Sequence, residues 1–160
     1  MANRVRGSLF VVGGLALALV VSGTANAADN WVGTWKLNAA NSKYSPGSAP
    51  KSNTAKIEAT EGGIKAATNG IGADDKPTHT EFQAKFDGKD YAYTGSGGND
   101  TISLKRIDDF TYVATLKSKG KAMLTSKNVI SKDGKTRTQT QTGTDAQGRT
   151  VNNTVVWDRQ

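Results

Sequence analysis

Turn signals recur at short intervals along the sequence and divide it into segments of six to eleven residues. The clearest of them are Glu61-Gly62-Gly63, Asp87-Gly88, Lys119-Gly120 and Asp133-Gly134. Asp-Gly between alternating segments is a strong hairpin signal, because both central residues of a type I′ turn need a positive φ. Segments of this length are short for helices, so they predict a chain of consecutive antiparallel strands.

Between the turns, apolar and polar side chains alternate with a period of two, as they do in half-buried strands. One face of one segment carries Phe110, Tyr112, Ala114 and Leu116, and one face of another carries Phe82, Ala84 and Phe86. No segment after residue 27 has a helical period. We predict about ten strands, at 31–37, 53–60, 64–71, 77–86, 89–94, 100–107, 110–118, 121–131, 135–144 and 149–158, with 38–52 as a surface loop.

The first 27 residues have the three parts of a secretion signal. Arg4 and Arg6 form a basic start, residues 9–21 form an apolar run, and Ala25-Asn26-Ala27 forms a small-x-small cleavage site. The apolar run is shorter than the roughly 20 residues that a membrane-spanning helix needs. We therefore expect cleavage after Ala27, a domain at residues 28–160 with no transmembrane segment, and a periplasmic or secreted location.

The domain is poor in large apolar residues. Residues 28–160 contain only 19 Leu, Ile, Val and Phe residues. A sandwich needs two well-filled apolar faces, whereas a barrel of eight to ten strands can enclose polar side chains, water or a ligand. The segment 136–144 is polar on both faces and could line a wet cavity or form an exposed edge. These features favour an all-β fold, an antiparallel up-and-down β-barrel of about 8–10 strands.

The first predicted strand contains Gly33-Thr34-Trp35-Lys36-Leu37, and the chain ends in Val155-Val156-Trp157-Asp158-Arg159-Gln160. The Gly-x-Trp pattern resembles the signature of the calycin superfamily, the lipocalins and fatty-acid-binding proteins, including bacterial secreted lipocalin-like proteins of unassigned activity. The resemblance implies that Gly33 allows close strand approach and that Trp35 plugs one barrel end. It also implies that Arg159 lies over Trp35 in a cation–π contact.

Two departures from the fatty-acid-binding proteins limit what the resemblance implies. Their barrel mouth is covered by two short helices, whereas the corresponding interval here is residues 38–52 with Pro46 and Pro50, which disfavours a helical lid. Their last strand carries an Arg-x-Tyr carboxylate grip, and this sequence has Val155-Val156-Trp157 in that place. A fatty-acid carboxylate site is therefore not carried over.

The sequence offers no recognisable catalytic or metal-binding constellation. There is no cysteine, and the single histidine, His79, has no partner for a zinc pair. The acid pairs Asp74-Asp75 and Asp108-Asp109 sit at turns without calcium-loop spacing. We therefore predict a protein that is not an enzyme and that needs neither a metal nor a cofactor.

The leading functional hypothesis is a carrier or sequestering protein that holds a small, largely apolar or amphipathic molecule in the barrel. Binding pockets are mostly apolar with a few polar anchors. Arg137 or the segment from Thr138 to Thr142 could supply those anchors. Candidate cavity residues are the aromatic side chains on predicted inward faces, namely Trp35, Phe82, Phe86, Tyr91, Tyr93, Tyr112 and Trp157. The alternative for each of them is that it packs in the core and does not contact a ligand.

A competing hypothesis places the function on the outer surface. Lys117, Lys119 and Lys121 surround one predicted hairpin tip, and the loop 38–52 is long enough to make contacts of its own. In an exported protein these features could contact envelope polysaccharide, anionic lipid or a partner protein. Nucleic acid is not expected as a partner, because no face interleaves basic and aromatic residues.

Overall fold

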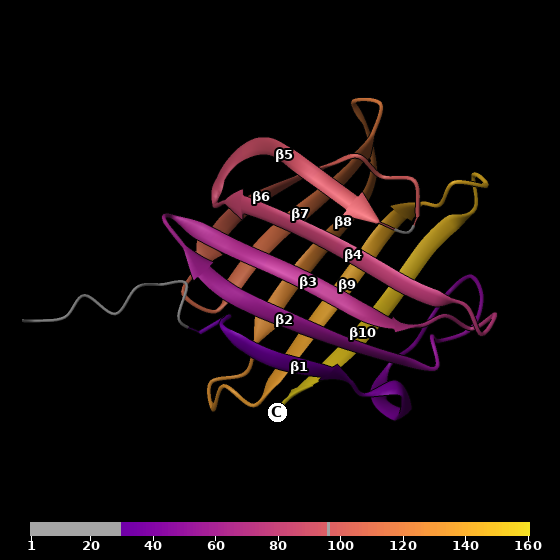
Figure 1. Cartoon of the computed structure of the whole chain (residues 1–160), viewed down its shortest axis with the longest axis horizontal. Helices are drawn as coiled ribbons and strands as arrows, with labels where there is room; N and C mark the ends of the chain where they lie inside the picture. The colour runs from indigo at the N-terminus through magenta and orange to yellow at the C-terminus, as the bar shows by residue number, and fades with distance from the viewer. Residues whose placement is uncertain (1–29, 96) are drawn as a thin grey trace, which may run out of the picture.

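The computed structural model describes residues 30–95 and 97–160 and contains ten strands in one sheet (Figure 1). The predicted secretion signal at residues 1–27 lies outside the described residues. The strands are β1 (Gly33–Leu37), β2 (Ser52–Thr60), β3 (Gly63–Ile71), β4 (Pro77–Lys85), β5 (Asp87–Gly95), β6 (Thr101–Asp108), β7 (Thr111–Ser118), β8 (Lys121–Ile130), β9 (Thr136–Thr144) and β10 (Thr150–Arg159).

Each strand pairs with the next one in antiparallel fashion, and β1 pairs with β10 to close the barrel. The predicted all-β up-and-down barrel is therefore confirmed, and every predicted strand boundary lies within two residues of the observed one. Closure removes the exposed sheet edges that a ten-stranded meander would otherwise present. Every strand is thus hydrogen-bonded to two neighbours, and no additional apolar element is needed to cover an edge of the sheet.

The barrel is flattened into two layers that cross each other. Strands β2, β3 and β4 run across the front in Figure 1, and β7 to β10 run behind them at a steep angle. Because the strands alternate in direction, the connections after odd-numbered strands lie at one end of the barrel and those after even-numbered strands at the other. We call these the open end and the closed end, respectively.

The closed end is sealed by Trp35 and Arg159. Trp35 is fully buried, and its indole N–H donates to the carbonyl of Trp31 at 3.0 Å. The Arg159 guanidinium lies 4.3 Å from the Trp35 ring centre. It also donates to the carbonyls of Asn30 and Gly134, both at 2.6 Å, and to that of Val32. The cation–π contact that the resemblance implied is thus present, reinforced by three backbone hydrogen bonds.

Gly33 is required by the approach of Arg159. It has a φ of +135°, and a Cβ atom placed on it would lie 2.8 Å from Nη1 of Arg159. We expect Gly33→Ala to lower the free energy of unfolding by about 1–3 kcal/mol, because the backbone strain and the displaced guanidinium add. Urea denaturation followed by circular dichroism measures this change. Gly148→Ala, at a φ of +79° with open space at its Cβ position, measures the cost of a positive φ without a steric contact.

Two local expectations need correction. The segment 38–52 is more than a loop: it contains a 3₁₀ turn at Ala39–Asn41, and Lys43 bridges to Thr154 of β10. Tyr44 in this segment packs against the core, and its burial raises the pKa of its hydroxyl to about 12. Phe110 does not join the inward face of its neighbours but lies in the β6–β7 turn with 38% of its surface exposed.

Candidate ligand-binding site

A cavity of about 430 Å³ occupies the barrel interior towards the open end. Side chains of both layers line it, and Ser48, Pro50 and Ala73 of the open-end connections border its mouth. A second hollow of about 500 Å³ lies at the same end, between the β5–β6, β7–β8 and β9–β10 connections. The two share Tyr93, Leu116 and Gln141, so they adjoin.

The rear wall of the cavity is polar. Strands β8 and β9 contribute Ser126, Asn128, Arg137, Gln139 and Gln141 to the lining. Cross-strand pairing aligns them, since Ser126 faces Gln141 and Asn128 faces Gln139. Tyr112 of β7 pairs with Asn128 on the other side, which extends the polar row by one strand.

The front wall is apolar in its deeper part. Here β2 supplies Ala55 and Ile57, β3 supplies Ala66, and β4 supplies Phe82. These strands are opposite β7, β8 and β9 in the ring order of the barrel, so the two walls face each other across the cavity. Nearer the mouth the front wall also becomes polar, with Asn53, Thr68 and Thr78.

Arg137 is the most unusual residue of the cavity, because its guanidinium is buried and lacks an acidic partner. The residue is only 5% exposed and lies between two indoles, with centroid distances of 4.7 Å to Trp157 and 5.6 Å to Trp35. Its Nε–H has no hydrogen-bond partner, and no ion pair within residues 30–95 and 97–160 includes it. An uncompensated buried charge of this kind costs several kcal/mol.

Tyr112 does not neutralise that charge. Its hydroxyl hydrogen-bonds the guanidinium of Arg137, but burial raises the pKa of the Tyr112 hydroxyl and the arginine offsets only part of the rise. The phenol therefore stays neutral around pH 7. Burial also lowers the pKa of Arg137, which still remains protonated because an arginine starts from a very high value. The pair presents a full positive charge to the cavity.

Asn128 carries the second unsatisfied group in the cavity. It is 1% exposed, and its Nδ2 donates to the carbonyl of Ser126 at 3.2 Å and to the Ser126 hydroxyl at 3.3 Å. A carbonyl can only accept, so the nitrogen of the amide must be the atom that faces Ser126. The opposite atom, Oδ1, has no hydrogen-bond partner among the described residues. Alternation with Ile130 could have placed Asn128 inside, although nothing in the sequence distinguished it as a site residue.

Of the predicted cavity residues, the structure brings five together around the cavity, namely Phe82, Tyr93, Tyr112, Arg137 and Trp157. Trp35 and Phe86 pack in the core and do not line it. The ring centres of Phe86 and Tyr112 are 5.4 Å apart, and the guanidinium carbon of Arg106 lies 4.9 Å from the centre of the Phe86 ring. Within the segment 138–142 that was predicted to supply anchors, Gln139 and Gln141 line the cavity, whereas Thr140 and Thr142 are exposed.

Tyr91 lies away from the cavity. Strands β4 and β5 pair only from Thr80 to Phe82 and diverge towards the closed end, which opens a separate side pocket. Tyr91 lines that pocket and donates its hydroxyl hydrogen to Asp87 at 2.9 Å. A bulge between Asp87 and Asp90 accompanies the divergence, but Tyr91 still pairs with the buried Ile102 and packs against the core, so it keeps the inward register and lies beyond the end of the cavity.

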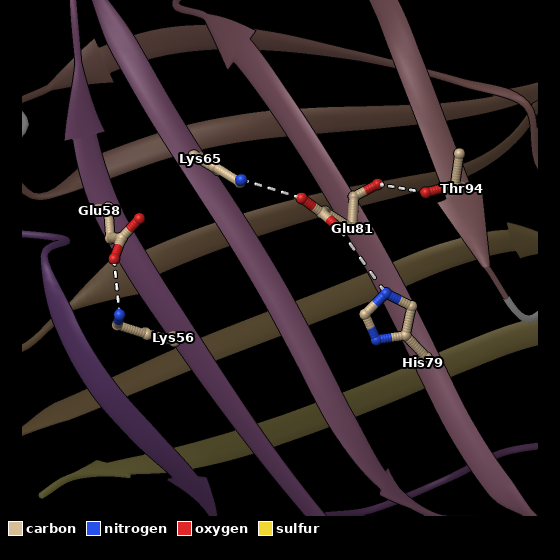
Figure 2. A network of polar contacts seen from close by, with 6 residues as sticks. All are labelled: Lys56, Glu58, Lys65, His79, Glu81 and Thr94. Atoms are coloured by element: carbon tan, nitrogen blue, oxygen red, sulfur yellow. Dashed lines mark hydrogen bonds and ion pairs between the residues drawn. The ribbon is translucent and has the colours of Figure 1, made fainter.

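His79 is exposed on the outer face of β4. Figure 2 shows Glu81 between His79 and Lys65, with contacts of 3.8 Å and 3.1 Å. The Nδ1 atom of His79 also contacts Oδ1 of Asn69 at 2.7 Å. The side chains of Lys65, His79 and Glu81 are about half exposed, so this network lies on the surface and contributes little to the stability of the fold.

Within the described residues, no cluster of His, Asp and Glu side chains could hold a metal ion. In the same part of the chain, no helix is long and apolar enough to span a membrane. A scan against protein-family models found no match to the chain, and a search of the curated proteins found none either. The function is therefore inferred from the geometry of the cavity.

Proposed function

We propose that the protein is a non-enzymatic carrier or sequestering protein that binds a small amphipathic molecule with an acidic group inside the barrel. The observation that carries this proposal is the buried guanidinium of Arg137, which faces the cavity and has no carboxylate partner among the described residues. A carboxylate, sulfonate or phosphate of a ligand would supply the missing negative charge. Charge-assisted hydrogen bonds to arginine are roughly twice as strong as neutral ones.

Other features of the molecule agree with this proposal. The cavity has about the volume expected for a small-molecule site, and it combines apolar walls with a few polar anchors. The sealed closed end leaves the open end as the route of entry. The closed ten-stranded barrel, with Gly33, Trp35 and Arg159 at one end, fits a calycin-like protein. The sequence of residues 1–27 further supports export to the periplasm or the outside of the cell.

The carrier function is tested by titration with 1-anilinonaphthalene-8-sulfonate, an aromatic sulfonate whose fluorescence rises in apolar surroundings. We expect saturable binding with one dominant site. Ala114→Phe fills part of the cavity from β7 and should weaken binding at least about tenfold, whereas Thr115→Phe points to the opposite face and should not. Equal affinities for the two variants would contradict the proposed location.

Native mass spectrometry of the protein purified from its own host provides a second measurement. We expect a bound small molecule with at least one acidic group, released on extraction with organic solvent. Protein that carries no bound molecule and also fails to bind the dye would refute the carrier proposal.

The surface hypothesis makes a different prediction. Two carboxylates partly neutralise the basic hairpin tip: Asp90 forms an ion pair with Lys117 at 2.7 Å, and Asp100 accepts a hydrogen bond from the backbone N–H of Lys119. We expect charge reversal at Lys119 and Lys121 to leave dye binding and the bound small molecule unchanged. Loss of envelope association in that variant would support a function on the outer surface instead.

A further inference from the structure

The two walls of the deep cavity differ in polarity along their length, and this difference constrains the shape of the ligand. From it we infer that the ligand is a facially amphipathic ring acid, with hydrogen-bonding groups along one edge and hydrocarbon on the opposite face. This inference rests on the proposed carrier function and adds the class of molecule carried. A flexible chain with a single polar head is the alternative that it excludes.

The polar wall is too long for one head group. Arg137, Gln139 and Gln141 follow one another on the inner face of β9, and a strand rises by about 3.3 Å per residue, so the row extends about 13 Å. A carboxylate or sulfonate covers only a small part of that length. Gln139 Oε1 already accepts from the Trp157 indole at 3.4 Å and Gln141 Oε1 from Asn153 at 3.0 Å, but the structure shows no hydrogen bond from either amide nitrogen within the described residues. Hydrocarbon laid along this row would displace water from those donors without replacing its hydrogen bonds, which is costly.

Asn128 specifies the kind of group that must accompany the acid. Its Oδ1 atom is buried, lacks a partner and can only accept a hydrogen bond. An ionised acid has no hydrogen to donate. A second group with an O–H or N–H is therefore needed. Arg137 pairs with Ile130, and Asn128 lies two residues from Ile130, so the acid and the donor bind diagonally adjacent positions of the same wall.

The opposite wall is suited to a flat hydrocarbon face. Ala55 and Ala66 are small, and Ile57 and Phe82 complete the apolar surface without polar atoms in their side chains. Alanine side chains project little from a sheet, so they leave room for a ring system between the two layers. The mouth of the cavity is polar on both sides, which confines this contrast to the deeper half.

Isothermal titration calorimetry with three sulfonates tests the inference. Anthraquinone-2-sulfonate has a flat body and one acid, 6,7-bis(hydroxymethyl)anthraquinone-2-sulfonate adds two alcohol donors along one edge that stay protonated at neutral pH, and decanesulfonate is a flexible chain with the same acid. We expect the bis(hydroxymethyl) compound to bind at least about tenfold more tightly than anthraquinone-2-sulfonate, because it satisfies a buried acceptor. Decanesulfonate should be the weakest of the three.

Asn128→Leu removes the acceptor while keeping the branching and number of side-chain heavy atoms, and it should abolish the difference between the two anthraquinones. Asn152→Leu, at an exposed position of β10, is the matched control and should preserve it. The comparison of the three probes on the unsubstituted protein stands even where a variant fails to fold. Equal binding of the two anthraquinones, or tighter binding of decanesulfonate, would overturn the inference and leave the carrier proposal intact. Binding of no sulfonate, the dye included, would instead refute the carrier proposal.

Discussion

Replacing Trp35 by alanine is expected to lower the free energy of unfolding by about 3–5 kcal/mol, the range for removal of a fully buried tryptophan. Trp35 is completely inaccessible to solvent, and its ring makes cation–π contacts with both Arg137 and Arg159. Its removal leaves a large void and takes away the ring beneath Arg159. The loss is comparable to the total stability of many domains of this size, which is 5–15 kcal/mol.

Urea denaturation followed by far-ultraviolet circular dichroism measures this loss without relying on tryptophan fluorescence. Trp35→Phe is the matched control: it keeps an aromatic ring but loses the 3.0 Å hydrogen bond to the Trp31 carbonyl. We expect it to be destabilised by an intermediate amount. A loss below about 1 kcal/mol for Trp35→Ala would show that the closed end is held together by other contacts.

The fold could be predicted from the sequence because its signals are local. Turn residues such as Asp133-Gly134 mark the hairpins, and alternation identifies the buried face of each strand. Gly134 indeed has a positive φ in the β8–β9 turn. The prediction was less accurate where a strand departs from regular geometry. Alternation places Tyr91 on its inward face, but the separation of β4 from β5 that puts it beside a different pocket depends on tertiary packing, which a period of two does not encode.

The candidate site was predictable only in part, for a related reason. Arg137 and the segment Thr138 to Thr142 are predicted as anchors from the sequence, and alternation counted from Arg137 selects Gln139 and Gln141 as the members of that segment that line the cavity. Asn128 was missed because an asparagine on an inward face carries no signal of its own. Asn128 becomes a candidate site residue only because its Nδ2 donates to Ser126 while its Oδ1 has no partner, and this arrangement is visible only in the folded structure.

Replacing Arg137 by methionine is expected to raise the stability of the protein without added ligand while destroying its affinity for anions. A buried charge without an acidic partner costs several kcal/mol, and each of the two desolvated cation–π contacts returns about 2 kcal/mol. Methionine keeps apolar contact with the Trp35 and Trp157 rings. We expect the free energy of unfolding to rise by about 1 kcal/mol and the affinity for 1-anilinonaphthalene-8-sulfonate to fall about 10–100-fold.

Arg159 provides the matched control, because it also lies against Trp35 but each of its three guanidinium nitrogens donates to a backbone carbonyl. Arg159→Met removes three hydrogen bonds to backbone carbonyls, so the free energy of unfolding should fall by about 2–4 kcal/mol. Urea denaturation of both variants, together with dye titration, therefore distinguishes a structural arginine from a functional one by the sign of the change. If Arg137→Met were destabilised as strongly as Arg159→Met, the guanidinium of Arg137 would be part of the core and the anion site would be refuted. A stabilised variant that no longer binds the dye is the result expected of a residue whose buried charge is retained for a ligand.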